Sequence, residues 1–147
     1  MLLPGARTTR LFYFHHGVTE STEMLYEEEM TQKIIAAAIE VHRILGPGLL
    51  ESSYERCLCH ELNLRKIPFQ RQKSLPISYK GINLGCAYRI DILVAERILL
   101  EIKAIDAITE IHKAQLLTYL KMSSLHVGLI LNFSARLMKN GIVRLVL

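Results

Sequence analysis

Three ionisable residues lie close together in the sequence where β-strands are expected. Asp91 stands between two isoleucines, and Glu101 and Lys103 follow the apolar segment 98–100. Because side chains alternate along a strand, Glu101 and Lys103 share one face. The short turn expected at 95–97 lets the two strands pair, which brings Asp91 roughly opposite Glu101. Charged groups in this apolar context need partners, because an unpaired buried charge is energetically unfavourable.

Two kinds of partner fit this arrangement. The first is a structural ion pair, in which Lys103 neutralises one of the carboxylates. The second is a divalent cation that relieves the repulsion between the carboxylates, and oxygen ligands suit Mg²⁺ or Mn²⁺. Such an ion polarises a phosphodiester and lowers the pKa of a bound water, while a lysine stabilises developing charge. The Glu-x-Lys tripeptide alone favours the ion-pair interpretation. With Asp91 upstream, the ion pair and the metal site are equally supported.

The helix expected over 109–122 carries a polar stripe. Gln115 and Tyr119 are four residues apart, and His112 precedes Gln115 by three, so the three share a face. We expect this face to be turned away from the buried leucines, where it lines the site or contacts phosphates; the alternative is a solvated helix face. Arg89 shares the face of Asp91 and either contacts phosphate or pairs with a carboxylate.

The elements that position these residues follow from the hydrophobic periodicity, which changes from helical spacing to alternation along the chain. Helices are expected over 27–45, 49–66 and 109–122. Strands are expected over 75–79, 82–94, 98–104, 125–132 and 142–147, the first three as an antiparallel meander. Gly85 is expected at a bulge or a close backbone approach. The order α-α-β-β-β-α-β-β predicts an α/β domain with a mixed central sheet flanked by helices.

Composition sets broad limits. The 147 residues suit one domain, which we place at 27–147, and residues 1–26 lack periodicity and are expected to be a poorly ordered extension. A net charge of +4 permits a polyanionic partner without requiring one. Three cysteines are an odd count, so we expect buried free thiols and a cytoplasmic protein. We see neither an apolar run of transmembrane length nor a good signal peptide.

A further motif makes the interpretation specific. Gly48-Leu-Leu-Glu51-Ser-Ser-Tyr54 reads G-x-x-E-x-x-Y, and this segment resembles the signature of the GxxExxY protein family within the PD-(D/E)XK nuclease-like superfamily. The resemblance covers about residues 27–147. Other matching blocks follow in order: His42, Gly46-Pro47-Gly48, Tyr88-Arg89-Ile90-Asp91, Leu100-Glu101-Ile102-Lys103-Ala104 and Gln115-Leu-Leu-Thr-Tyr119-Leu. The chain departs from the superfamily's namesake pattern in one place, since Ile90 rather than proline precedes Asp91.

The resemblance implies a restriction-endonuclease-like fold and a role for each matching residue. Asp91 and Glu101 would bind the metal, with the Ile102 carbonyl as a third ligand. Lys103 would assist the attacking water, and Glu51 would help to organise the site. The Gln115/Tyr119 pair resembles the Gln-x-x-x-Tyr motif of RecB-type exonucleases, where it supports the site and contacts DNA.

The leading functional hypothesis is therefore Mg²⁺-dependent (or Mn²⁺-dependent) hydrolysis of phosphodiester bonds in DNA, with RNA as the less favoured substrate. The alternative is a non-catalytic module that keeps the nuclease fold and binds nucleic acid or another protein. The domain is small for a nuclease and shows no added recognition domain. We therefore expect a homodimer or a partner protein, with nucleic acid rather than a membrane as the ligand.

Overall fold

A computed structural model describes residues 3–85 and 88–147, with side chains from residue 21 onward. The chain divides into two compact units, residues 1–33 and 34–147. Its first helix, α1, spans Leu3–Leu45 and therefore begins well before the expected position 27. The division into an extension at 1–26 and a domain at 27–147 stays a prediction. None of the described helices is long and apolar enough to cross a membrane.

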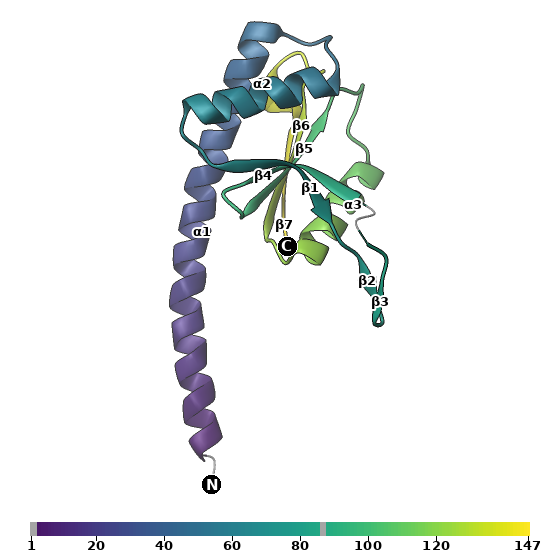
Figure 1. The fold of residues 1–147 in the computed structure, drawn as a ribbon. Coiled ribbons are helices and arrows are strands. Elements are labelled where there is room, and N and C mark those ends of the chain that lie inside the picture. Colours follow the sequence, from purple (N-terminus) through teal and green to yellow (C-terminus); the bar gives the residue numbers. More distant parts are fainter. Residues whose placement is uncertain (1–2, 86–87) are drawn as a thin grey trace. The chain divides into compact units, whose positions relative to one another are not determined.

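The second unit is built on a five-stranded sheet in the order β1-β4-β5-β6-β7 (Figure 1). Its strands are β1 (Phe69–Leu75), β4 (Tyr88–Val94), β5 (Ile98–Lys103), β6 (Val127–Asn132) and β7 (Ile142–Val146). Strands β5 and β6 are parallel and the other neighbours are antiparallel, so the sheet is mixed as expected. Two helices, α2 (Glu51–Leu64) and α3 (Glu110–Ser123), and a short 3₁₀ helix, η1 (Met138–Gly141), also belong to this unit.

The two faces of the sheet are covered by different helices. Leu116, Tyr119 and Leu120 of α3 pack with Leu93 and Leu99 in one buried cluster. The alternate residues of β5 point to the opposite face, and they are also buried. Figure 1 shows α2 on that side, where Tyr54, Leu58 and Leu62 are its fully buried residues. Burial on both faces explains why β5 and β6 read as continuous apolar runs.

The first expected strand is wrong in position. The strand that pairs with β4 is β1, which begins at Phe69 and ends at Leu75. Residues expected to extend it form instead a separate hairpin of β2 (Ser78–Tyr79) and β3 (Ile82–Asn83). Lys80 and Gly81 form the turn between them, with φ of 45° and 86°. Apolar alternation missed β1 because it is an edge strand whose side chains are mostly exposed.

Smaller differences concern helix ends and special residues. Helix α2 begins at Glu51, with Leu50 as the N-cap, and ends at Leu64. Gly85 adopts a φ of 72° in the loop after β3 rather than in a strand, and open space surrounds the position of a Cβ, so no close backbone approach explains it. Cys59 is a buried free thiol, but Cys57 is exposed, contrary to expectation. Cys86 lies outside the described residues.

Candidate active site

The candidate site lies where strands β4 and β5 stop pairing. Their register joins Ile92 to Leu100, and one further step along the strands places Asp91 opposite Glu101, as the sequence predicts. At this point the Asp91 side chain, rather than the backbone of β4, accepts a hydrogen bond from β5: its Oδ2 lies 2.8 Å from the Ile102 amide. Asp91 is therefore anchored to the strand that carries Glu101.

Glu101 is a buried carboxylate in an unusual state. Its side chain is only 8% exposed, and its Oε1 is buried without a hydrogen-bond partner among the described residues. Burial, followed by repulsion from Asp91, raises the pKa of Glu101 to about 8, although the nearby Lys103 opposes this rise. A buried carboxylate oxygen without a donor is unfavourable, so Glu101 requires either a proton or a cation.

The pKa of Asp91 is raised as well. Burial raises the pKa of Asp91 above its ordinary value, and the Ile102 amide opposes the rise. Negative charge on Glu55 raises it further, while Lys103 lowers it. Lys103 is half-buried, and its positive charge lowers the pKa of both carboxyl groups. Its ammonium nevertheless makes no ion pair within 4.0 Å in the described part of the chain. The structural ion pair considered from the sequence is therefore not formed by Lys103 in this structure.

The G-x-x-E-x-x-Y segment builds one wall of the site. The buried Tyr54 Oη donates to the Gly46 carbonyl at 2.6 Å and accepts from the Leu49 amide at 3.1 Å, which fixes the loop before α2. Gly48 has a φ of 112°, a conformation that favours glycine. The loop delivers Glu51 to the first turn of α2, where its Oε1 accepts from the Ala104 amide at 3.2 Å. The motif thus joins α2 to the end of β5.

One acidic residue of the site was missed in the sequence. Glu55 is 4% exposed and lies one helical turn after Glu51. Its carboxylate accepts from Arg71 Nε at 2.6 Å and from Gln72 Nε2 at 2.7 Å, both on β1. Gln72 has a φ of 54°, and the β1–β4 register lacks a pair at this position, opposite Asp91. The four-residue spacing from Glu51 could have revealed Glu55, because it places both carboxylates on one helix face.

A second missed residue supports the end of β5. Asn132 is buried at the end of β6, beside Lys103 in the parallel register. Its Oδ1 accepts from the Ile105 amide at 3.1 Å, and its Nδ2 donates to the Ile105 carbonyl at 2.9 Å. The Phe133 amide also donates to the Lys103 carbonyl at 2.8 Å. These bonds fix the chain that follows Lys103.

The polar stripe of α3 is only partly as expected. Gln115 is exposed, and its Nε2 donates to the Tyr119 Oη at 2.8 Å. Tyr119 is not turned away from the leucines, because its ring is buried in their cluster and only the hydroxyl meets Gln115. His112 caps the helix instead of extending the stripe, since its Nδ1 accepts from the Thr109 amide at 2.9 Å. Thr109 is the N-cap of α3.

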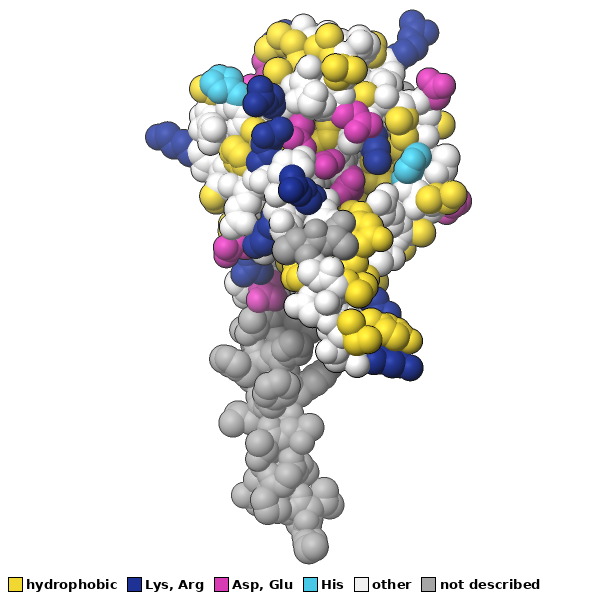
Figure 2. Space-filling model, turned by 45° about the vertical axis from the view of Figure 1, so that its right-hand side comes forward, with side chains coloured by type: hydrophobic (Ala, Val, Ile, Leu, Met, Phe, Trp, Pro, Cys, Tyr) yellow, Lys and Arg dark blue, Asp and Glu magenta, His cyan; other side chains and the backbone are white. Residues whose placement is uncertain are grey.

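The remaining candidate, Arg89, is exposed on β4. Over residues 3–85 and 88–147 its guanidinium makes no ion pair, so the expected alternative of a carboxylate partner is not seen. Figure 2 shows acidic side chains gathered on one face of the molecule, with lysine and arginine side chains beside them. A face of this kind can hold a cation and a polyanion together.

The donor set fits a hard divalent cation. No three His, Cys, Asp or Glu side chains in the described ranges form a closed metal-binding group. The predicted ligand set, however, has two carboxylates and one backbone carbonyl, that of Ile102. The unsatisfied Oε1 of Glu101 is the observation that supports a cation here. Oxygen donors that repel each other and lack compensating hydrogen bonds suit Mg²⁺ or Mn²⁺.

Comparison with known families agrees with this geometry. Residues 28–145 match the PD-(D/E)XK nuclease superfamily. The match spans most of the chain, so the protein belongs to this superfamily, whose nucleases generally use divalent metal ions. The assignment to the GxxExxY family within it stays a prediction. Neither the curated proteins nor the solved structures that were searched gave a match.

Proposed function

We propose that the protein is a metal-dependent nuclease that hydrolyses phosphodiester bonds in DNA. The single observation that carries the proposal is the buried Glu101 carboxylate, which lacks a partner and stands opposite Asp91. Membership of the PD-(D/E)XK nuclease superfamily supports nucleic acid as the ligand. RNA is the less favoured substrate, and the assay below distinguishes the two.

Each residue of the site has a definite task in this proposal. Asp91, Glu101 and the Ile102 carbonyl hold Mg²⁺ or Mn²⁺, and the hydrogen bond from the Ile102 amide orients Asp91 for this purpose. The bound ion would polarise the phosphodiester and lower the pKa of a bound water. Lys103 donates hydrogen bonds to the attacking water or to a phosphate oxygen, stabilising the charge that develops. Its half-buried position strengthens this interaction because water screens it less.

The surrounding residues position this centre. Glu51 holds the Ala104 amide and so keeps the end of β5 in place. Gln115 and Tyr119 form the wall contributed by α3, and Tyr119 lies close enough for Glu101 and Asp91 to raise its pKa, although burial raises it most. Arg89 and His112 are proposed to contact phosphates, with His112 doing so through its Nε2 because Nδ1 is engaged in the cap.

A nuclease assay tests the proposal. The purified chain is incubated with single- and double-stranded DNA and RNA in Mg²⁺ or Mn²⁺, beside Asp91→Ala and Lys103→Ala. Lys139→Ala, at an exposed lysine of η1, is the matched control for the lysine change. We expect cleavage by the wild type and the control, and its loss in the two site variants. Equal cleavage in all four proteins means that the assigned site is not responsible.

One observation favours a second candidate function. The described residues form no closed group of three metal-binding side chains, which suits a module that keeps the fold without catalysis. In that case the chain binds nucleic acid or a protein but cleaves nothing with either ion. We also propose that the chain acts as a homodimer or with a partner protein, and size-exclusion chromatography with light scattering tests the homodimer.

A further inference from the structure

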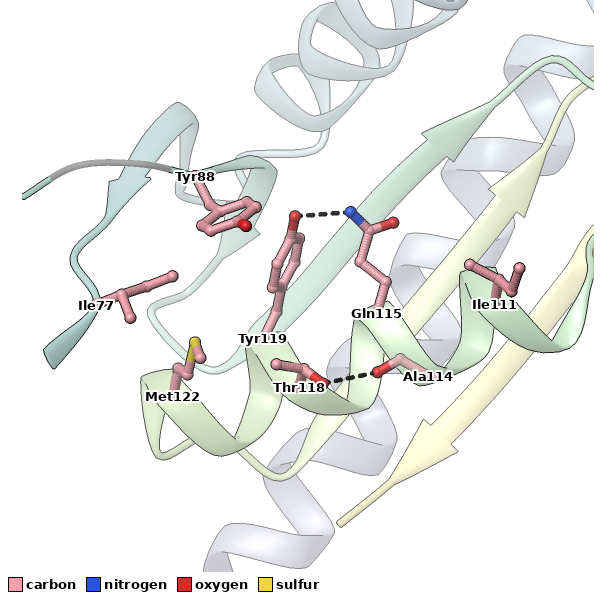
Figure 3. A pocket seen from close by; sticks show the side chains of 8 residues that line it. All are labelled: Ile77, Tyr88, Ile111, Ala114, Gln115, Thr118, Tyr119 and Met122. Atoms are coloured by element: carbon pink, nitrogen blue, oxygen red, sulfur yellow. Dashed lines mark hydrogen bonds between the residues drawn. The ribbon is translucent and has the colours of Figure 1, made fainter. Parts of the chain in front are cut away.

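A pocket opens between α3 on one side and, on the other, Ile77 just before β2 and Tyr88 at the start of β4. Its volume is about 470 Å³, within the range of small-ligand sites. Figure 3 shows the side chains that line it converging from these two parts of the fold. The lining residues are Ile77, Tyr88, Ile111, Ala114, Gln115, Thr118, Tyr119 and Met122.

The walls of the pocket are apolar and are not covered by the rest of the second unit. Tyr88, Ile111 and Met122 are 46%, 78% and 43% exposed. Large apolar side chains gathered around one hollow mark a binding surface more often than scattered ones do. The lining residues include no charged side chain, so the pocket itself suits neither a metal ion nor a phosphate.

Two aromatic rings and one amide define what the pocket can recognise. The rings of Tyr88 and Tyr119 lie 5.8 Å apart and are tilted by 53°, and Tyr88 is partly exposed beside the pocket. Tyr119 is held from behind by the core cluster. Gln115 uses one amide hydrogen on Tyr119, as Figure 3 shows, and retains its carbonyl and a second hydrogen. Such an amide can pair with the edge of a base.

The pocket adjoins the acidic site through shared residues. Tyr119 packs in one cluster with Leu93 and Leu99, which lie two residues from Asp91 and Glu101 on the same strand faces. Glu101 and Asp91 also act electrostatically on the Tyr119 hydroxyl. Figure 2 shows hydrophobic side chains beside the acidic ones on one face of the molecule. A ligand whose phosphate lies at the acidic site can therefore place a neighbouring chemical group of the same molecule in this pocket.

We propose that the pocket binds an unpaired nucleobase of the polynucleotide whose phosphate lies at Asp91 and Glu101. This inference rests on the proposed nuclease function and specifies its substrate class as single-stranded or locally unpaired nucleic acid. A paired base in a duplex is stacked on both faces and cannot lie against Tyr88. Stacking on an aromatic ring tolerates any base, while the Gln115 amide adds a polar contact to its edge.

The test measures binding separately from cleavage. In a Glu101→Gln background, which keeps the substrate intact, fluorescence anisotropy gives the Kd of a single-stranded oligonucleotide, of the same strand with one abasic position, and of the duplex. Tyr88→Ala removes the stacking ring and Tyr88→Phe keeps it. Tyr79→Ala is the matched control, because Tyr79 is 60% exposed and does not line the pocket. Ala114→Leu narrows the pocket from an exposed helix position and serves as a second variant.

We expect Tyr88→Ala and Ala114→Leu to weaken single-strand binding, and Tyr88→Ala by roughly 5- to 100-fold, the range for one stacked base. Tyr88→Phe and Tyr79→Ala should bind like the parent. One abasic position should weaken binding to the parent protein and have a smaller effect on Tyr88→Ala, because the Gln115 contact to the base edge remains. Equal binding by Tyr88→Ala and Tyr79→Ala, or an abasic effect that is just as large without the ring, overturns the inference.

Cleavage by the otherwise unaltered chain separates this inference from the proposed function. If Mg²⁺-dependent cleavage requires Asp91 while Tyr88→Ala has no effect on binding, the pocket inference fails and the nuclease function stands. If the chain neither binds nor cleaves any oligonucleotide, both are overturned. Preferred binding of the duplex, unaffected by Tyr88→Ala, also contradicts a base pocket and leaves an apolar protein side chain as the better ligand.

Discussion

Replacing Glu101 by glutamine should make the metal-free protein more stable at neutral pH. Burial holds the pKa of Glu101 near 8, against an ordinary value of 4.5. Between these two values the unfolded chain ionises Glu101 and the folded chain does not. Ionisation therefore favours unfolding, so stability falls as the pH rises from about 4.5 to about 8 and the loss is constant above that. Glutamine resembles the protonated acid and does not titrate.

The size of this loss of stability follows from the interval between the ordinary pKa of Glu101 and the pH of the measurement. One pH unit corresponds to about 1.4 kcal/mol, so the interval from 4.5 to pH 7 corresponds to roughly 3 kcal/mol. The buried amide of glutamine has no better partners than the acid and lowers stability by about 1–3 kcal/mol. This second effect does not depend on pH. The change of the stability difference with pH therefore isolates the ionisation of Glu101.

Urea unfolding of both proteins in EDTA, from pH 4.5 to pH 8.5, measures this change. The free energy of unfolding of Glu101→Gln relative to wild type should rise by roughly 3 kcal/mol between pH 4.5 and pH 7. Adding Mg²⁺ or Mn²⁺ should then stabilise the wild type at pH 7 and have less effect on the variant, which lacks one ligand. A stability difference that is flat with pH, together with equal stabilisation by metal, would refute the reasoning.

Three further changes test the supports of the site. Tyr54→Phe removes the hydroxyl that fixes the loop before α2, and we expect a loss of about 1–3 kcal/mol in urea unfolding together with weaker cleavage. Arg71→Ala leaves the buried Glu55 carboxylate with Gln72 as its one remaining donor among the described residues. Thermal unfolding should show a loss of about 1–3 kcal/mol, and unchanged stability would contradict the pairing. Asn132→Ala deprives Ile105 of two bonds, and faster amide exchange at that residue is expected.

Much of the fold was predictable because its signals are strong and local. The apolar runs of β5 and β6 predicted buried strands, and the helix expected over 109–122 corresponds to α3 at Glu110–Ser123. The short turn between β4 and β5 also fixed the register that sets Asp91 opposite Glu101. Periodicity failed at β1, because an edge strand with polar, exposed residues has no apolar alternation to detect.

The site itself was predictable in its residues but not in its interactions. Lys103 stands beside the carboxylates without pairing to them, and the backbone amide of Ile102 is the actual partner of Asp91. Glu55 could not be recognised from strand patterns, because its partners lie on the strand that was missed. The burial of Tyr119 depends on how α3 rotates over the sheet, which helical spacing alone does not determine.

The most direct test of the central claim is single-turnover cleavage of an end-labelled, single-stranded DNA by the purified chain in excess. Wild type and Lys103→Gln are compared in Mg²⁺, in Mn²⁺ and in EDTA. We predict cleavage by the wild type only when metal is present, and a rate at least about 100-fold lower for Lys103→Gln, the range for loss of one transition-state contact. Cleavage that continues in EDTA, or at the same rate in Lys103→Gln, would contradict the assigned site.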